Sequence, residues 1–348
     1  VRVESVAGPA ATIINGAGWH RRCVYISHPE AVVHGFTMLG GYARTNWGPQ
    51  VYPVSCGGGV FADGAGTLEN CILYFNRAGL LGGQAYLQGG GALRNCLIVG
   101  GQAAQCGGVY ATNGGVVESC TIVDNSTLLT NLAGGMWCVN GGAVTNSVFY
   151  GNRYFDSNLV AFVAEVSTFG AGWSFAYTRV APAIAGAGNI TNDPLFADAL
   201  SANYRLSPLS PCDGAGIIMP WMATAVDLDG GPRIQKGAVD MGAYETPGVY
   251  YVAPNGAHQT PFATWAQAAT SIIAALQVAA PGTTIVVSNG TYTLDAMVEI
   301  GTNLIVRSLA GAAATMLDGQ GVRTCVRVDH VDAVLDGFTL TGGVGTNQ

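Results

Sequence analysis

Residues 58–73 read GGVFADGAGTLENCIL, residues 107–122 read GGVYATNGGVVESCTI, and residues 134–149 read GGMWCVNGGAVTNSVF. Each segment has a Gly-Gly start, a short apolar run, a turn, and a second run that ends on Asn or Ser followed by a small residue. A looser copy is LRNCLI at residues 93–98. The equivalent positions 71, 96, 120 and 147 are 25, 24 and 27 residues apart. This period predicts stacked coils of short parallel strands.

Stacked coils bring equivalent side chains into columns about 4.8 Å apart. The small residues at one inward position predict a buried structural ladder of Cys71, Cys96, Cys120 and Ser147. At the adjoining bend, where Asn tolerates unusual backbone angles, the sequence places Asn70, Asn95 and Asn146, with Ser119 interrupting. The predicted fold is therefore all-β, a right-handed parallel β-helix solenoid.

The composition fits this fold and excludes some partners. The chain has 51 Gly, 49% hydrophobic and only 10% charged residues, which suits many short strands joined by tight bends. The net charge is −7 and Lys236 is the only lysine, so we expect no nucleic-acid partner and no polybasic membrane contact. No apolar run approaches about 18 residues, so we also expect no membrane span.

Nine cysteines are present without any C-x-x-C spacing, and only His20 lies near one of them, Cys23. A zinc site is therefore not expected. The regular placement of the cysteines favours buried, stacked thiols, with some disulfides as the alternative. No cofactor is predicted.

A second, longer period relates the two ends of the chain. Residues 3–12, VESVAGPAAT, match residues 306–315, VRSLAGAAAT, at an offset of 303. Residues 35–37 match residues 337–339 at an offset of 302. We therefore expect residues 1–248 to form the main part and C-terminal cap of one β-helix unit. Residues 249–348 are expected to begin the next tandem unit.

The region between the two copies has a different pattern. From about residue 191, Pro and Asp-Gly turns predict a looped end cap. Residues 264–278 then predict a short capping helix with Thr264 as its N-cap. Its apolar stripe consists of Trp265, Ala268, Ala269, Ile272, Ile273 and Leu276. Such a helix would cover the open first coil of a solenoid, so we expect Trp265, Ile272, Ile273 and Leu276 to form an inter-unit cap.

Two groups of segments resemble known families. The start of pectate-lyase-like right-handed β-helix proteins is similar to YYVAPNG at 250–256, the Trp265 helix, PGTTI at 281–285 and NGTY at 289–292. The closing segment of bacterial surface β-helix proteins of the choice-of-anchor type is similar to DPLF at 193–196, YRL at 204–206, Asp227, Asp229, Gly230, Arg233 and DMGAYE at 240–245. The resemblance implies an extracellular or cell-surface protein.

The β-helix fold also carries polysaccharide lyases and hydrolases, which need a base, acidic groups and cations that bind an acidic sugar. The basic residues are dispersed and no catalytic residue is predicted. Asp227, Asp229 and Asp240 form the best acidic group and are weak candidates for a metal site. Turn formation, with pairing to Arg233, is the favoured interpretation of these aspartates.

Two further features bear on carbohydrates. The aromatic residues Trp47, Phe61, Tyr110 and Trp137 are candidates for a sugar-stacking face. The sequons that begin at Asn125, Asn189 and Asn289 are possible N-glycosylation sites.

These observations predict a non-catalytic structural repeat unit of a large extracellular or cell-surface protein, assembling head to tail into a fibre. Its expected partners are neighbouring copies of the same unit, with glycans as a further possibility. The alternative is a polysaccharide lyase, a hydrolase or a carbohydrate-binding β-helix.

Overall fold

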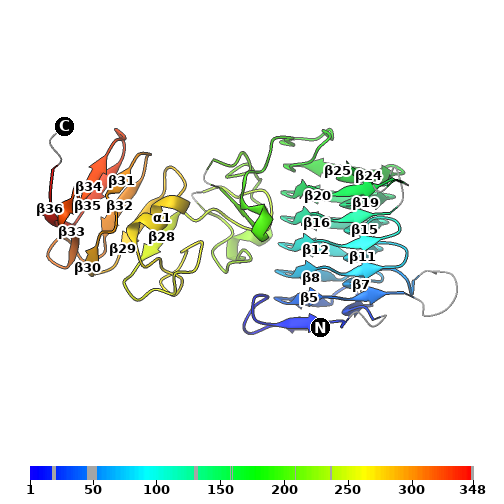
Figure 1. Cartoon of the computed structure of the whole chain (residues 1–348). Helices are drawn as coiled ribbons and strands as arrows, with labels where there is room; N and C mark the ends of the chain where they lie inside the picture. The colour runs from blue at the N-terminus through cyan, green and yellow to red at the C-terminus, as the bar shows by residue number, and fades with distance from the viewer. Residues whose placement is uncertain are drawn as a thin grey trace. The chain divides into compact units, whose positions relative to one another are not determined.

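A computed structural model gives the fold of the chain (Figure 1). It describes residues 1–348 apart from 18–20, 45–52, 129–131, 157, 159, 208, 236 and 346–348. The chain divides into two compact units. Unit 1 comprises Val1–Tyr204, Pro211–Ile234 and Ala238–Glu245; unit 2 comprises Arg205–Ser210, Gln235–Gly237 and Thr246–Gln348. The main division, between Glu245 and Thr246, lies near the predicted boundary at 248. That the units belong to tandem copies stays a prediction.

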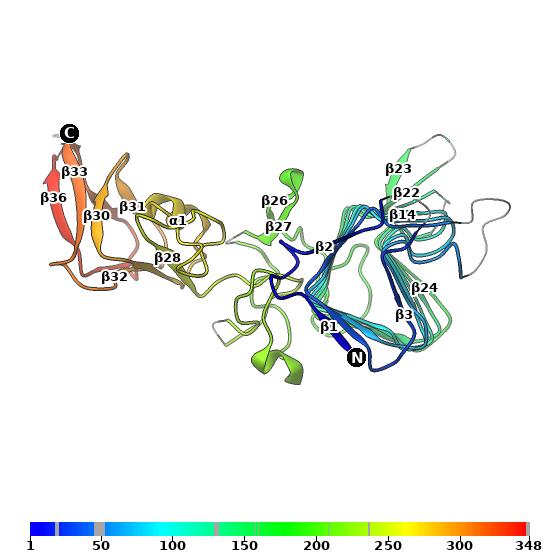
Figure 2. The ribbon, with the colours of Figure 1, turned by 90° about the horizontal axis from the view of Figure 1, so that it is seen from below.

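Unit 1 is a parallel β-solenoid, in which strands of successive coils lie behind one another when viewed along the axis (Figure 2). Sheet A contains β1 (Arg2–Glu4), β4 (Val32–His34), β8 (Thr67–Glu69), β12 (Ala92–Arg94), β16 (Gly115–Glu118), β20 (Gly142–Thr145) and β25 (Trp173–Ala176). Sheet B contains β2 (Ile13–Asn15), β5 (Thr37–Leu39), β9 (Ile72–Tyr74), β13 (Leu97–Val99), β17 (Thr121–Val123) and β21 (Val148–Tyr150). The predicted all-β parallel β-helix is confirmed.

Two more sheets complete each coil. Sheet C contains β3 (Val24–Ile26), β7 (Val60–Ala62), β11 (Ala85–Gln88), β15 (Val109–Thr112), β19 (Met136–Val139) and β24 (Val166–Phe169). Sheet D contains β6 (Tyr42–Ala43), β10 (Arg77–Ala78), β14 (Gln102–Ala103), β18 (Ser126–Thr127), β22 (Arg153–Phe155) and β23 (Ala161–Val163), of which the last two pair antiparallel. A complete coil therefore contributes a short strand to each of four sheets. Left-handed residues such as Phe75, with φ of 50°, bend the chain after sheet B and separate the short sheet D strands.

The alternation of side chains along each strand builds the core. On sheet A the middle residues point inward, and Leu68, Leu93, Val117 and Val144 are fully buried. Successive side chains of a strand point to opposite faces. The last residue of each sheet A strand, which directly follows an inward residue, therefore points outward. The inward column belongs to one continuous core that runs through the coils.

The bend between sheets A and B contains both predicted ladders. Asn70, Asn95 and Asn146 have φ between 50° and 52°, and Ser119 has φ of 52°. The residues that follow them, Cys71, Cys96, Cys120 and Ser147, are fully buried. The thiol or hydroxyl of each donates to the carbonyl oxygen two residues earlier, at 3.2, 3.2, 3.3 and 2.9 Å respectively. The side chains thus satisfy carbonyls at the bend in addition to packing in the core.

The sequence predicted that the turn-rich region closes the end of the coils. In the structure, most of this region lies along the side of the coils instead. Residues 196–206 form β26 (Phe196–Asp198), η1 (Ala199–Ser201) and β27 (Asn203–Leu206). Residues 211–234 and 238–245, here called the closing segment, contain η2 (Pro220–Thr224). The closing segment lies along the asparagine bend: Asn95 Nδ2 donates to Val226 O at 2.9 Å and Asn146 Nδ2 to Ile217 O at 2.7 Å. These amide donors hold it on the flank of the solenoid.

Unit 2 is a shorter stack of parallel strands. One sheet contains β28 (Val249–Val252), β29 (Thr284–Val287), β32 (Ile305–Ser308) and β35 (Val334–Asp336). A second contains β30 (Gly290–Thr293), β33 (Thr315–Arg323) and β36 (Thr339–Gly343); a third contains β31 (Val298–Ile300) and β34 (Val326–Val328). Tyr250, Ile285, Val306 and Leu317 belong to its core.

The predicted helix at 264–278 is only partly correct. Helix α1 spans Ile272–Val278, and its N-cap is Ser271, whose hydroxyl accepts from Ala274 N at 3.2 Å. The helix does not extend back to Thr264, because Ala269 is paired with β28: its N–H donates to Tyr251 O at 2.9 Å. No helix in the described part of the chain is long and apolar enough to span a membrane.

The first coil of unit 1 recurs in unit 2. Arg2 pairs with Val32 as Ile305 pairs with Val334, and Ile13 pairs with Thr37 as Met316 pairs with Thr339. The side-chain contacts recur as well. The Ser5 and Thr12 hydroxyls lie 2.6 Å apart, as do those of Ser308 and Thr315. The sequence match at offsets 302 and 303 thus corresponds to a match in strand register and hydrogen bonds.

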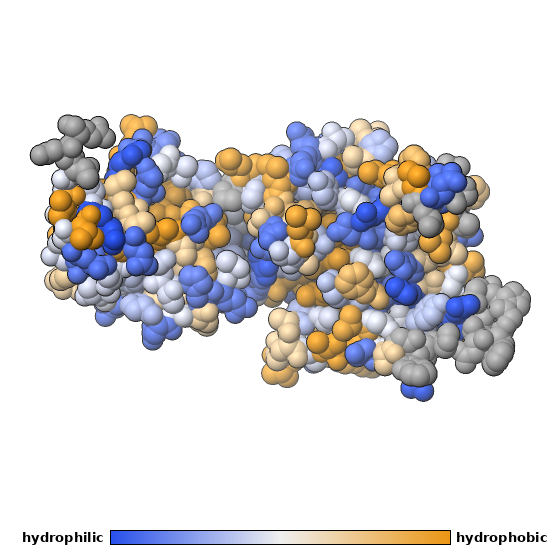
Figure 3. Space-filling model, in the orientation of Figure 1, coloured by the Kyte–Doolittle hydropathy of each residue, from blue (hydrophilic) through white to orange (hydrophobic). Residues whose placement is uncertain are grey.

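The two equivalent coils differ in exposure. Val3 is 51% exposed, whereas its counterpart Val306 is fully buried; Ile14 is partly buried, whereas its counterpart Leu317 is fully buried. Figure 3 shows hydrophobic residues gathered over the first strands of unit 1. The difference follows from sheet topology. β1, β2 and β3 are end strands with no strand before them in their sheets among the described residues. Their counterparts β32, β33 and β34 each follow another strand, which is β29, β30 and β31 respectively.

Candidate functional site

A row of charged side chains runs across sheet A of unit 1. The last residues of consecutive strands are in register: Glu4 with His34, His34 with Glu69, Glu69 with Arg94, and Arg94 with Glu118. All of them point outward because the residues before them point into the core. Acidic and basic or imidazole groups alternate from coil to coil, an arrangement that favours cross-strand pairing.

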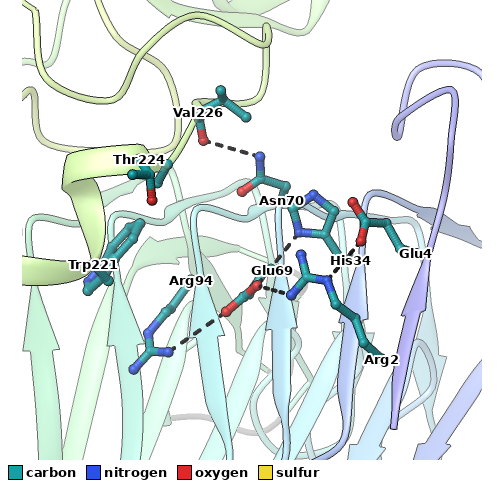
Figure 4. A pocket seen from close by; sticks show the side chains of 10 residues that line it. Arg2, Glu4, His34, Glu69, Asn70, Arg94, Trp221, Thr224 and Val226 are labelled. Carbon is teal, nitrogen blue, oxygen red and sulfur yellow. Dashed lines mark hydrogen bonds and ion pairs between the residues drawn. The ribbon is translucent and has the colours of Figure 1, made fainter.

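Glu69 lies at the centre of this row (Figure 4). Its carboxylate accepts a hydrogen bond from Arg2 Nη1 at 3.0 Å and lies 3.8 Å from Arg94 Nη1. His34 Nδ1 is 3.7 Å from the same carboxylate, beyond hydrogen-bond distance. Three groups that can carry positive charge therefore surround one acid.

The two arginines have second acidic partners. Arg2 Nε donates to Glu4 Oε2 at 2.8 Å, and this hydrogen bond holds the pKa of Glu4 below its ordinary value. Arg94 Nε donates to Glu118 Oε2 at 2.7 Å. The positive charges of the row are thus neutralised by its own carboxylates.

The closing segment adds a wall to this row and forms a cavity of about 360 Å³. Trp221 and Thr224 come from η2, and Ala225 and Val226 follow it. The Arg94 guanidinium lies 5.9 Å from the centre of the Trp221 ring, within the range of a cation–π contact. Asn70, predicted as a ladder residue, also lines the cavity and donates to Val226 O at 3.1 Å (Figure 4).

This arrangement has the chemistry of a polar binding pocket. An aromatic ring beside guanidinium, imidazole and carboxylate groups can stack on and hydrogen-bond a polar molecule such as a sugar. An anionic ligand would have to compete with Glu69 for Arg2 and Arg94. His34 is the imidazole in the pocket, and Glu69 is the nearest carboxylate to it.

The predicted acidic group lies in a buried network of the closing segment. Arg233 is fully buried and its Nε lies 3.1 Å from Glu245 Oε1. Arg233 also donates to Asn95 Oδ1 at 3.0 Å, Asp240 O at 3.0 Å and Gly242 O at 2.7 Å. The guanidinium therefore joins residues 240–245 of the closing segment to the asparagine ladder.

The aspartates themselves bind backbone amides. Asp227 accepts from the N–H groups of Asp229, Gly231 and Glu245 at 2.9 to 3.0 Å, and Asp240 accepts from Gly214 N at 2.6 Å. Burial raises the pKa of Asp227 to about 7 and that of Glu245 to about 10. Among the described residues, no three or more His, Cys, Asp or Glu side chains are placed to hold a metal ion.

The three sequons have different environments. Asn125 is fully buried, and its Nδ2 donates to Ile98 O, Val123 O and Asn152 Oδ1. A glycan on Asn125 is incompatible with this packing. Asn189 is partly buried and donates to Phe175 O and Ile184 O, whereas Asn289 is exposed. Glycosylation at Asn189 and Asn289 stays a prediction.

The predicted cap residues separate into two groups. Ile272 is buried, and Ile273 and Leu276 pack against the core of unit 2. Trp265 precedes α1, is 41% exposed and packs against Tyr251 with ring centres 4.6 Å apart. The helix therefore covers β28, β29 and β31 within unit 2. A role of these residues between units stays a prediction.

The predicted aromatic residues Phe61, Tyr110 and Trp137 belong to one stack of rings on sheet C. Tyr25, Phe61, Tyr86, Tyr110 and Trp137 follow one another on sheet C with ring centres 4.7 to 5.6 Å apart. Phe61 is fully buried and so has no face for a sugar. Trp47 lies outside the described residues.

Sequence reasoning missed the charged row and Trp221. A signal was present in the aligned repeats: the residue directly before each Asn or Ser of the ladder is Glu69, Arg94, Glu118 or Thr145. Nothing in the repeat pattern indicated that Trp221, more than 100 residues away from Arg94, lies over the same coil.

The comparisons with known proteins identify no family for this chain. No family model matches the chain, and no curated protein matches it. A solved structure described as a PL6 family alginate lyase is similar at 10% identity with a TM-score of 0.18. That alignment covers 98% of this chain, which spans 64% of the lyase chain. A likeness of this size carries no argument about the activity of the present chain.

Proposed function

We propose that this chain is a non-catalytic structural unit of a larger extracellular or cell-surface β-helix protein, in which units follow one another head to tail and build a fibre. The observation that carries the proposal is the recurrence of the first coil of unit 1, with the same register and side-chain hydrogen bonds, at residues 304–345. Heterologous contacts between identical units generate open filaments when the rotation does not close a ring.

The chemistry of the cavity supports the same proposal. Arg94 is bound by Glu118 of the next coil, whereas Arg2 is bound by Glu4 of its own strand and by Glu69, which lies two strands further along sheet A. A catalytic site for an acidic polysaccharide needs cations that are available to the substrate. Here the cations are already used in joining coils.

The test is electron microscopy of the native protein, combined with the sequence of the parent gene. We expect extended particles whose length grows with the number of repeats that the gene encodes. Isolated globular particles, together with a gene that contains no array, would reject the proposal.

A second candidate, a carbohydrate-binding or carbohydrate-cleaving protein, is favoured by Trp221 and the polar groups of the 360 Å³ cavity. The test is incubation with acidic and neutral polysaccharides, scored for binding, unsaturated products and reducing ends. Trp221→Ala is the informative variant, and Trp265→Ala in unit 2 is its control. Binding or turnover that Trp221→Ala alone abolishes would support this candidate; no binding and no turnover by the unaltered chain would remove it.

A further inference from the structure

The first coil of unit 1 has an open edge. β1 pairs with β4, β2 with β5 and β3 with β7, and each of β1, β2 and β3 is the last strand of its sheet among the described residues. Directly after β1, the N–H of Ser5 donates to His34 O at 3.0 Å. Because donors alternate along a strand, the N–H groups of Arg2, Glu4 and Val6 face the open side.

Unit 2 contains the equivalent coil with a partner on that side. β29 pairs with β32, β30 with β33 and β31 with β34, all in parallel. Ile305 N donates to Thr283 O at 3.1 Å and Leu309 N to Val287 O at 2.8 Å. Ile305 and Leu309 are the counterparts of Arg2 and Val6 at the offset of 303.

The partner strands bury the apolar residues of the coil. Leu304 and Val306 are 3% and 0% exposed, whereas their counterparts Val1 and Val3 are 88% and 51% exposed. Ile285, which lies opposite Val306, is itself fully buried. An apolar end strand with unpaired backbone groups is a template for strand addition.

We propose that the open edge of β1, β2 and β3 binds residues 249–303 of a second copy of this chain by parallel strand addition. The register is that of unit 2, with Ile285 of the second copy opposite Val3, Tyr292 opposite Ile14 and Val298 opposite Val24. This inference rests on the proposed head-to-tail arrangement and specifies its contact.

The side chains at the new contact are compatible with this register. Thr284 would lie opposite Arg2 and Val286 opposite Glu4, so no like charges meet along β1. The Ser5–Thr12 hydroxyl pair, which matches Ser308–Thr315 in the covered coil, is already in place. At this hydroxyl pair, the open edge of unit 1 therefore already has the local geometry that the covered coil of unit 2 has with its partner strands in place.

The test uses the full chain preceded by a second copy of residues 246–303, with Asn303 joined directly to Val1, because Leu304 is the counterpart of Val1. Amide hydrogen exchange of residues 1–15 is compared with that of the chain without the added copy. We expect exchange at Arg2 and Val6 to slow by roughly a hundredfold, as free edge amides enter a ladder.

Two variants of the extended chain sharpen the test. Val3→Asp places a charge opposite Ile285 and is expected to remove most of the added protection. Val6→Asp is the matched control, because Val6 is fully exposed and its counterpart Leu309 remains 60% exposed beside β29. The same variants without the added copy show whether unit 1 itself still folds.

Unchanged exchange of residues 1–15 in the extended chain would overturn the proposed contact, as would equal effects of Val3→Asp and Val6→Asp. Protection together with polysaccharide turnover would leave the strand addition standing while rejecting the structural role. Fibres without protection would reject this contact alone.

Discussion

Replacing Arg233 by alanine is expected to detach the closing segment from the coils. Arg233 is fully buried, 3.1 Å from Glu245, and donates to Asn95 Oδ1 and to two carbonyl oxygens of the closing segment. Alanine would leave these acceptors buried without a donor. The asparagine ladder would lose its contact with Arg233 but keep its contact with Val226.

The size of the effect follows from these contacts. Removing one partner of a buried ion pair typically costs about 3 to 5 kcal/mol. Each orphaned acceptor costs about 1 to 3 kcal/mol when counted alone, but contacts of one side chain do not add independently. Burial raises the pKa of Glu245 to about 10, so the carboxyl is largely protonated at neutral pH and the ion pair is weakened. We therefore expect the lower end of the range, about 3 kcal/mol.

The measurement is urea unfolding at neutral pH, combined with hydrogen exchange of residues 211–245. Arg233→Ala is expected to lower the unfolding free energy and to speed exchange in the closing segment. Arg233→Lys keeps the charge but not the forked donor geometry, so its effect should be intermediate. Arg77→Ala, on the exposed face of β10, is the control. A loss below about 1 kcal/mol with the closing segment still protected would refute the role given to Arg233.

Three further outcomes are expected. Burial raises the pKa of Asp227 to about 7, so between about pH 4 and 7 the carboxyl keeps a proton in the folded chain that it has released in the unfolded chain. The unfolding free energy should therefore fall as pH rises through this window. Urea unfolding at pH 5 and 8 measures this fall, and Asp227→Asn should make it smaller. Eight of the nine free cysteines are buried, and burial raises the pKa of Cys56 to about 11 and that of Cys106 to about 12. A thiol reagent should therefore modify only Cys23 rapidly in the folded chain, and all nine cysteines after denaturation. Rapid modification of several thiols in the folded chain would contradict the buried ladder. Asn95→Gly should lower the unfolding free energy by about 1 kcal/mol less than Asn95→Ala in the same assay. Both variants lose the hydrogen bonds of Asn95, but only glycine adopts the φ of 52° without strain. Equal losses of unfolding free energy would show that backbone strain is unimportant at this position.

The coil period and its ladders could be predicted because they depend on local chemistry repeated in sequence. Cys96 and Asn95 recur at equivalent positions, and each contributes a backbone angle or a small buried side chain that its neighbours in the column also contribute. The start of α1 could not be predicted from the apolar stripe. Ala268 and Ala269 fit a helix, but pairing of Ala269 with β28 satisfies its backbone and delays the helix to Ile272.

The cavity required contacts that no local pattern encodes. Glu69 and Arg94 are one coil apart, so their pairing follows from the period once the outward position is recognised. Trp221 reaches the same coil only because the closing segment turns back along the solenoid. That path depends on long-range hydrogen bonds from Asn70 and Asn95 to Val226, which the turn-rich sequence does not reveal.

The closing segment also limits how the solenoid can change in length. Coils that contact only their neighbours tolerate insertion or deletion of a whole repeat of about 25 residues. Here, however, one segment is anchored at Asn70 and Asn95 through Val226 and at Asn146 through Ile217. An added or missing coil between these anchors would move one set of asparagines a full strand spacing, about 4.8 Å, away from its acceptors. The closing segment therefore fixes the number of coils between its anchors at Asn70 and Asn146. Variation in length between relatives should be confined to coils that lie beyond these anchors.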